Sequence, residues 1–127
     1  MRVYVDADVL IWHLRGEPRA HRFLRRLRED GGFELWIGAM QRAEIVFFMR
    51  PNEEEATLLF LAEFHTAPVD QGLVDAAGRL YRRWHASHGV DPNNAILAAT
   101  VQRTGGKICC LNTRHYPMPD LAVERAW

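Results

Sequence analysis

The side chains best suited to chemistry in this 127-residue chain are carboxylates and carboxamides that interrupt apolar stretches. Their oxygen atoms are the ligands that hard cations such as Mg²⁺ and Mn²⁺ prefer. A cation held in this way activates water for hydrolysis, so no nucleophilic side chain is required. The candidate ligands are Asp6, Glu44, Asn94 and Asn112, with Asp8 beside the first of them.

Asp6 and Asp8 follow an apolar run of β-branched and aromatic residues, which is typical of a buried parallel strand. Ligands in open α/β sheets bind at the carboxyl ends of the strands, where Asp6 would lie. Either acid could instead cap the helix that follows the strand. For Asp8, the alternatives are such a cap and an orienting role behind Asp6.

Glu44 lies four residues after Met40 and four before Phe48, within a stripe that is predicted to face the core. A carboxylate in such a stripe is costly to bury unless it is paired, bound to metal or placed at a water-filled cleft. An ion pair with Arg42 or Arg15 is therefore the alternative to a metal-binding role.

The two carboxamides border strongly apolar segments. Asn94 follows Asp91-Pro92, which predicts a helix N-cap with proline at the first helical position, so Asn94 could simply support that cap. Asn112 follows an apolar strand, where it could instead form a turn. Each carboxamide alone has a structural explanation. If Asn94 and Asn112 meet Asp6 and Glu44 at one edge of the sheet, however, the four side chains would suit a Mg²⁺ or Mn²⁺ site.

Strands are predicted to alternate with helices along the chain, which indicates a parallel, three-layer α/β/α sandwich in a single domain, residues 1–127. In such a sheet Asp6 and Asn112 lie at the same edge. The predicted strands are residues 3–6, 33–37, 107–111 and 121–123, with 66–69 too short to assign. The predicted helices are residues 9–14, 20–29, 39–48, 56–64, a long amphipathic helix capped by Asp70, and 93–103.

Three of the predicted helices give specific expectations. Asn52 and Glu55 have the spacing of a capping box at the start of the helix at 56–64. After Asp70, apolar residues recur at helical spacing from Leu73 to Trp84, so one stripe of that helix should be buried. The helix at 93–103 is apolar nearly all round and should therefore be central.

Composition excludes several classes of protein. The net charge is zero, although 15 of the 16 basic residues are arginine, so charge alone does not indicate nucleic-acid binding. Cys109 and Cys110 are adjacent in a predicted strand and should be free thiols, as in a reducing cytoplasm. No stretch is long enough to span a membrane, and the six histidines lack zinc-ligand spacing. A cytoplasmic location is expected.

Four segments resemble the PIN-domain ribonucleases, and among them the VapC-type toxins of bacterial toxin–antitoxin pairs. They are V-D-A-D-V-L-I-W-H-L-R-G at 5–16, A-M-Q-R-A-E-I at 39–45, N-A-I-L-A-A-T at 94–100 and L-N-T-R-H-Y-P at 111–117. Their order and spacing are those of the family, and together they extend over almost the whole chain.

The resemblance implies a Rossmann-like fold and a divalent metal held by Asp6, Glu44, Asn94 and Asn112. One position departs from the family pattern D-A-L-I-A-A-T, because Asn94 stands where an aspartate is expected. A carboxamide offers an oxygen but no charge, so weaker metal binding is expected. Asp91 is a conceivable substitute, although its place before Pro92 favours the capping role.

The leading hypothesis is metal-dependent hydrolysis of RNA phosphodiesters by an activated water. Thr113 or Asp8 would orient ligands or water, and Arg15 and Arg114 are candidates for contacts with the RNA backbone. The alternative is a PIN-fold module that binds RNA or a protein without cleaving, which the missing acid favours. A haloacid-dehalogenase-like enzyme is set aside, because no acidic pair follows the only lysine, Lys107.

The resemblance also implies partners. VapC-type proteins dimerise, and a VapB-like antitoxin places a segment in an apolar groove that covers the acidic pocket. Several aromatic segments are compatible with such a groove, although helical aromatic stripes more often belong to the core. These segments are Trp12, Trp36, Phe47-Phe48 and Phe60 to Phe64.

Overall fold

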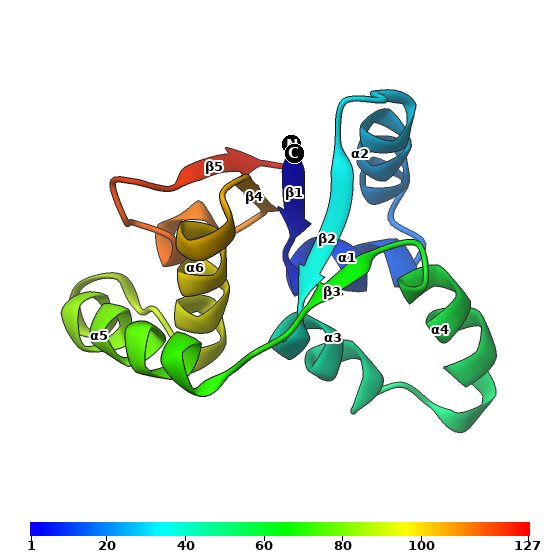
Figure 1. Ribbon diagram of the computed structural model, residues 1–127. Coiled ribbons are helices and arrows are strands. Elements are labelled where there is room, and N and C mark those ends of the chain that lie inside the picture. Colours follow the sequence, from blue (N-terminus) through cyan, green and yellow to red (C-terminus); the bar gives the residue numbers. More distant parts are fainter.

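A parallel sheet of five strands forms the centre of the computed structural model, which describes residues 1–127 (Figure 1). The strand order is β3-β2-β1-β4-β5, and every neighbouring pair is parallel. The strands are β1 (Arg2–Val5), β2 (Glu34–Gly38), β3 (His65–Ala67), β4 (Lys107–Cys110) and β5 (Ala122–Arg125). The predicted parallel sheet is confirmed, and the strand β3 overlaps the segment 66–69 that the sequence left unassigned.

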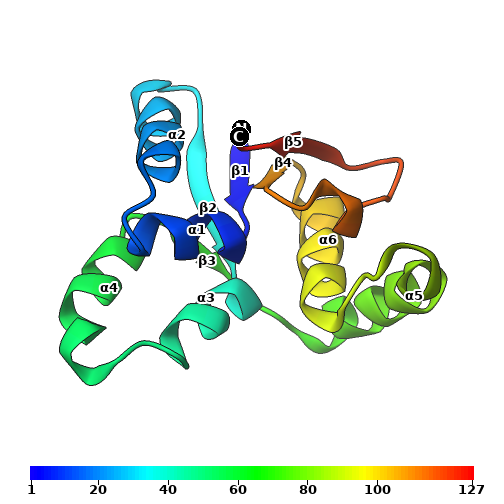
Figure 2. The same cartoon turned by 180° about the vertical axis from the view of Figure 1, so that it is seen from behind.

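Six α-helices cover the two faces of this sheet. They are α1 (Ala7–Leu14), α2 (Pro18–Glu29), α3 (Ala39–Val46), α4 (Glu54–Leu61), α5 (Gln71–His88) and α6 (Pro92–Thr104). Two short 3₁₀ helices, η1 (Pro51–Glu53) and η2 (Thr113–His115), complete the structure. Views from opposite sides show α5 and α6 on one side of the sheet and α2 and α4 on the other (Figures 1 and 2). The predicted three-layer arrangement is therefore confirmed.

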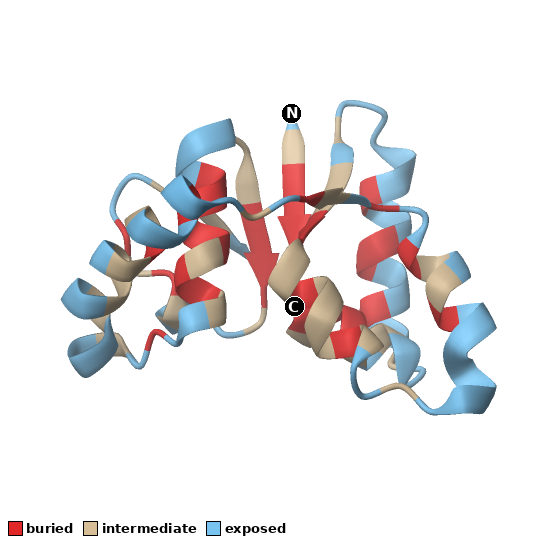
Figure 3. Cartoon of the chain, turned by 60° about the horizontal axis from the view of Figure 1, so that its bottom comes forward, coloured by how far each residue is buried: buried red, intermediate tan, exposed pale blue.

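Side-chain alternation along β1 divides the core into two halves. Val3 and Val5 pack among residues of α1, α2 and α4, whereas Tyr4 packs on the other face among residues of α5 and α6. All three side chains are fully buried. Each such side chain contributes roughly 1.5–3 kcal/mol on burial, so both halves stabilise the central strand. Figure 3 shows buried residues concentrated at the centre of the sheet and on the helix faces that cover it.

The position of β1 determines where a ligand can reach the sheet. The chain proceeds from β1 to β2 and β3 on one side, and β4 and β5 lie on the other. Strand order therefore reverses beside β1, and such a switch point opens a crevice at the carboxyl ends of the strands. Asp6 directly follows β1, and its N–H donates to the carbonyl of Cys109 on β4 at 2.9 Å.

The helices α5 and α6 begin as the sequence predicts. The Asp70 carboxylate accepts a hydrogen bond from the N–H of Leu73 at 2.8 Å, which caps α5. Asp91 caps α6, with Pro92 in the first turn. Leu73 and Ala77 of the predicted stripe are buried, and α6 contains seven buried residues, so α6 is the central helix that its composition indicates.

The prediction for α3 was wrong at its carboxyl end. The helix ends at Val46, and Phe47 and Phe48 lie beyond it with 76% and 83% of their surface exposed. The residues that α3 buries are Gln41 and Ile45, one turn apart. The stripe that contains Glu44 therefore does not face the core.

The expected capping box at Asn52 does not form. Pro51 starts the 3₁₀ helix η1, and α4 follows directly from Glu53 without a side-chain cap. Cys109 and Cys110 are free and buried, as predicted. None of the helices is both long and apolar enough to cross a membrane.

Candidate functional site

Asp6 is the buried acid of the candidate site. It is the N-cap of α1, and its Oδ1 accepts a hydrogen bond from the N–H of Ala7 at 2.8 Å. Its Oδ2 accepts a second bond, at 2.6 Å, from the hydroxyl of Tyr116. The capping explanation for Asp6 is therefore correct, yet its Oδ2 is bonded to Tyr116, in a distant segment of the chain. A cap and a ligand are compatible roles for one carboxylate, because each oxygen has two lone pairs.

Burial makes Asp6 a weak acid. The pKa of its carboxyl is raised to about 7, first by loss of hydration and then by the neighbouring charge of Asp8. The hydrogen bonds from Tyr116 and Ala7 oppose this rise, and the charge of Glu44 adds to it. Three carboxyl groups thus lie close enough to influence one another, which is typical of functional sites.

Asp8 ties the start of α1 to the chain after β4. Its Oδ1 accepts from the N–H of Val9 at 2.7 Å, and its Oδ2 accepts from the N–H groups of Leu111 and Asn112 at 2.9 and 3.2 Å. These three backbone donors occupy much of the carboxylate. Asp8 therefore holds the segment that carries Asn112 beside the end of β1.

Glu44 is half-buried on α3 and is paired with an amide rather than with an arginine. Its Oε1 accepts a hydrogen bond from Nδ2 of Asn93 at 2.7 Å. None of the five ion pairs in the structure includes Glu44. The alternative explanation, an ion pair of Glu44 with Arg42 or Arg15, is therefore wrong. Burial raises the pKa of Glu44, the bond from Asn93 lowers it, and the charges of Asp91 and Asp8 raise it further.

Asn94 is buried in the first turn of α6 and forms a reciprocal capping box with Asp91. The N–H of Asn94 donates to the Asp91 carboxylate at 2.7 Å, and the N–H of Asp91 donates to Oδ1 of Asn94 at 3.2 Å. The Asn94 Nδ2 donates to the hydroxyl oxygen of Tyr116 at 3.2 Å. Asn94 thus supports the cap, as one explanation held, and also reaches Asp6 through Tyr116.

Asn112 and Thr113 lie on the exposed rim of the site, where η2 begins. The Asn112 side chain contacts Nε2 of His115 at 3.2 Å. Arg114 donates to the backbone carbonyl of Ser87 at 3.1 Å, so its guanidinium is partly engaged with the end of α5. The structure therefore brings Asn112 next to Asp8 and places Thr113 and Arg114 at the margin.

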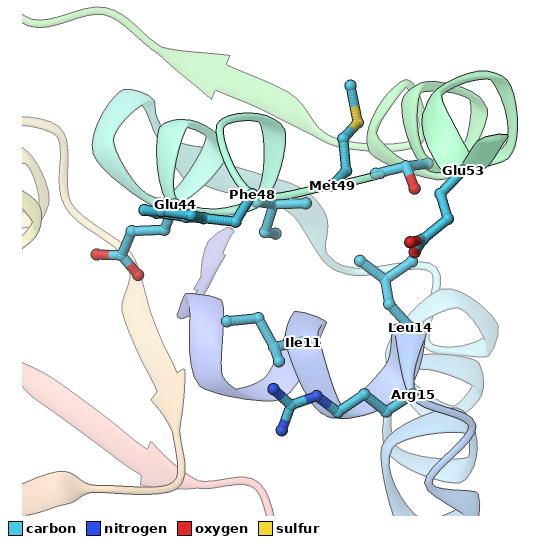
Figure 4. Close-up of a pocket in the computed structure, with 9 residues that line it drawn as sticks. Ile11, Leu14, Arg15, Glu44, Phe48, Met49 and Glu53 are labelled. Atoms are coloured by element: carbon cyan, nitrogen blue, oxygen red, sulfur yellow. The ribbon is translucent and has the colours of Figure 1, made fainter. Parts of the chain in front are cut away.

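A groove of about 360 Å³ runs between α1, α3 and α4, with Glu44 on its wall. Its apolar surface comes from Ile11, Leu14, Ile45, Phe48 and Met49. Figure 4 shows Ile11 on α1 and the predicted RNA contact Arg15 directly after that helix, across the groove from Glu44 and Phe48.

The donor set suits a hydrated divalent cation rather than a closed metal cage. No three His, Cys, Asp or Glu side chains come close enough together to hold a metal ion by themselves. Mg²⁺, however, is commonly bound through one or two carboxylates, several waters and the phosphates of the substrate. The neighbouring carboxylates of Asp6 and Glu44, each with lone pairs to spare, fit that pattern.

Two residues of the site escaped the sequence interpretation. The family position falls on Asn94, so nothing in the sequence distinguishes Asn93, yet Asn93 is the residue that holds Glu44. Tyr116 lies in the L-N-T-R-H-Y-P segment, but nothing in its spacing relates it to Asp6, 110 residues away. The only signal in the sequence was the polar hydroxyl that Tyr116 carries on an otherwise apolar side chain.

The sequence is similar to known proteins over almost its whole length. Residues 3–119 match the PIN domain family. The chain is 34% identical to Ribonuclease VapC10 of Mycobacterium tuberculosis over 117 residues, which cover 91% of this chain and 86% of that relative. It is 33% identical to Ribonuclease VapC19 of the same organism over 119 residues, 92% of this chain and 94% of the relative.

Solved structures share the fold at lower identity. VapBC2 from Rickettsia felis, bound to a DNA fragment from its promoter, superposes with a TM-score of 0.78 at 17% identity, covering 100% of this chain and 99% of that chain. FitAcB from Neisseria gonorrhoeae gives a TM-score of 0.74 at 21% identity, with 98% of each chain covered. These likenesses agree with the α/β architecture described above.

Proposed function

This chain belongs to the PIN domain family, and we propose that it is a VapC-type endoribonuclease, the toxin of a toxin–antitoxin pair. The identity of about a third to ribonucleases over nine-tenths of the chain supports the assignment. One structural observation carries the chemistry: buried Asp6 directly follows the central strand at the switch point of the sheet, close enough to Glu44 for that charge to raise its pKa.

The proposed ligands of Mg²⁺ or Mn²⁺ are Asp6 and Glu44, with Asn94 and Asn112 at the two remaining positions. Asn94 Oδ1 accepts one backbone hydrogen bond and retains a lone pair, so its carbonyl is a neutral ligand at best. Asp91, the conceivable substitute, uses its carboxylate to cap α6. The site therefore has two strong anionic ligands.

A bound divalent cation would supply a water of lowered pKa and would neutralise charge that develops on the phosphate. The chain contributes the geometry. Asp6 is fixed through both of its oxygens, and Asn93 holds one oxygen of Glu44 so that the other remains free. Asp8 positions the segment of Asn112 and Thr113, and Arg15 in the groove would contact the RNA backbone.

A second function has one observation in its favour. Asn94 uses both the oxygen and the nitrogen of its amide in hydrogen bonds, which suits a PIN-fold module that binds RNA or a protein without cleaving it. RNA binding that is unaffected by a chelator, with no cleavage in Mg²⁺ or Mn²⁺, would support this module over the nuclease.

The proposed partner is a VapB-like antitoxin. Structures of the fold include a toxin–antitoxin complex from Klebsiella pneumoniae, which has a TM-score of 0.78 at 16% identity. The apolar groove that reaches Glu44 offers a surface for an antitoxin segment, and Phe48 leaves an exposed aromatic ring on it. A homodimer is the proposed assembly of the toxin.

The test is cleavage of single-stranded RNA by the purified chain with Mn²⁺, with and without EDTA. We expect cleavage that EDTA abolishes and that Asp6→Asn reduces by 100-fold or more, because one of two anionic ligands is lost. Asn94→Asp should add a charged ligand and strengthen Mn²⁺ binding roughly tenfold. Cleavage that survives in Asp6→Asn would show that the site lies elsewhere.

A further inference from the structure

Asp6, Tyr116 and Asn94 form a buried chain of hydrogen bonds whose direction is fixed. We propose that Tyr116 is a positioning residue for the metal-binding carboxylate of Asp6, and that Asn94 acts by directing the hydroxyl hydrogen of Tyr116 toward Asp6. The inference rests on the proposed function, because it assigns these residues a role toward the same cation.

The orientation of the Asn94 amide follows from its capping role. The backbone N–H of Asp91 can only donate, so the amide atom that it meets at 3.2 Å is the oxygen. The other amide atom, Nδ2, therefore faces the Tyr116 hydroxyl at 3.2 Å, where it can only donate. Asn94 thus presents a hydrogen, not a lone pair, to Tyr116.

A tyrosine hydroxyl has one hydrogen, and the two contacts of the Tyr116 hydroxyl determine where that hydrogen points. Because the Tyr116 oxygen accepts from Asn94, its own hydrogen points to Oδ2 of Asp6, 2.6 Å away. This distance is typical of a bond to a charged acceptor. An aspartate at position 94 could not donate to Tyr116, so Asn94→Asp would lose this orienting contact while it gains a charged ligand.

Tyr116 is held firmly enough to position another side chain. It is only 4% exposed, and its ring packs in the half of the core that α5 and α6 form, with Val90 and Met118 in the same cluster. Its backbone N–H donates to the carbonyl of Thr113 at 3.1 Å, which anchors it directly after η2. The hydroxyl is therefore a fixed donor.

The consequence for Asp6 is that each carboxylate oxygen has one fixed donor and one lone pair left. Ala7 holds Oδ1 and Tyr116 holds Oδ2, so the side chain cannot rotate freely when a cation approaches. Outer contacts of this kind orient metal ligands, and their removal commonly weakens metal binding by 10–100-fold. The Asn94–Tyr116 pair would thus assist the site without supplying a charge.

The experiment is a titration with Mn²⁺ alone, in which EPR measures the free ion, on the full chain and on Tyr116→Phe, Asn94→Ala and the double variant. We expect each single variant to bind Mn²⁺ about tenfold more weakly. The double variant should bind no more weakly than Asn94→Ala alone, because Asn94→Ala has already broken the contact that Tyr116→Phe removes. Tyr4→Phe is the matched control, since its buried hydroxyl bonds Thr104 instead, and it should bind like the wild type.

A spectroscopic readout separates positioning from folding. In protein labelled with ¹³C at the tyrosine ring carbon that bears oxygen, the Tyr116 resonance should shift on addition of Mg²⁺, and the Tyr4 resonance should not. Asn94→Ala keeps the ring of Tyr116 in the core, so it provides the same test if Tyr116→Phe proves unstable.

The outcomes distinguish the two proposals. If Asp6→Asn leaves Mn²⁺ binding intact, the proposed metal site is wrong. If Asp6→Asn abolishes binding while Tyr116→Phe and Asn94→Ala stay within twofold of the wild type, the site stands and the positioning role is overturned. Losses that multiply to about 100-fold in the double variant would overturn the coupling between Asn94 and Tyr116.

Discussion

Asp6 and Asp8 are two residues apart, yet the fold gives their carboxyl groups different surroundings. Asp6 is desolvated and its pKa is raised to about 7, so ionising it in the folded protein is costly. Asp8 instead accepts three backbone hydrogen bonds, from Val9, Leu111 and Asn112. The acid that the proposed chemistry needs is therefore the one that the fold tolerates least.

The pH dependence follows from the raised pKa of Asp6. In the unfolded chain its carboxyl ionises near the ordinary value of 3.8, whereas in the folded protein it keeps its proton up to about pH 7. Between these values the folded state binds more protons than the unfolded state, so the contribution of Asp6 to stability falls as pH rises. It is fully present below pH 3.8 and lost above 7.

We predict that Asp6→Asn raises the free energy of unfolding at pH 8 by about 1–3 kcal/mol, because it removes a buried charge. The gain should shrink at pH 5, where the carboxyl of Asp6 is protonated. Asp8→Asn should lower the free energy of unfolding by about 1–3 kcal/mol, because bonds to a charged acceptor are lost. Urea unfolding of both variants at the two pH values measures this, and effects of equal sign would contradict it.

The sequence could reveal Asp6 but not the contacts that decide its behaviour. An acid at the end of an apolar run is visible in a linear sequence, and the family motif locates Glu44 and Asn94. Tyr116 and Asn93 became part of the site only through contacts between segments 110 and 49 residues apart. Local pattern carries no information about such pairs.

At the scale of elements, the prediction succeeded where a side-chain cap starts the helix and failed where residue spacing alone indicated the helix boundary. Asp70 and Asp91 are side-chain caps, so the starts of α5 and α6 were correct. The apolar residues Phe47 and Phe48 suggested a longer helix, but α3 ends before them and they are exposed. Asn52 had the spacing of a cap, yet Pro51 directs the chain into a 3₁₀ turn.

The start of α6 affects both the stability of that helix and the proposed metal site. Asp91 caps the helix that delivers both Asn93 and Asn94. We predict that Asp91→Ala lowers the free energy of unfolding by about 1 kcal/mol, the usual cost of a lost cap. Asp91→Ser keeps a capping oxygen and should stay close to the wild type, which separates the cap from the charge.

Mn²⁺ binding of the same two variants tests the alternative role of Asp91. Because its carboxylate is engaged with the N–H of Asn94, we expect Asp91→Ser to bind Mn²⁺ within about threefold of the wild type. A loss of 100-fold in Asp91→Ser, with stability retained, would instead make Asp91 the acid that replaces the missing aspartate.

For the whole molecule, Glu44 links the groove to the proposed metal site. It lies on the groove wall and its charge also raises the pKa of Asp6, so a partner that fills the groove would cover Glu44. Such a partner needs an apolar segment to match Ile11, Leu14 and Met49. This arrangement suits inhibition by an antitoxin that binds beside the chemistry.

Adjacent phenylalanines provide a matched test of the groove. Phe48 lines it and Phe47 does not, although both rings are largely exposed, at 83% and 76%. We predict that Phe48→Ser weakens binding of the antitoxin from the same toxin–antitoxin pair by roughly tenfold or more, as loss of an aromatic anchor commonly does. Phe47→Ser should change that dissociation constant less than threefold, and neither change should alter the melting temperature much. Calorimetric titration of both variants measures the difference, and equal weakening by the two would place the antitoxin on another face.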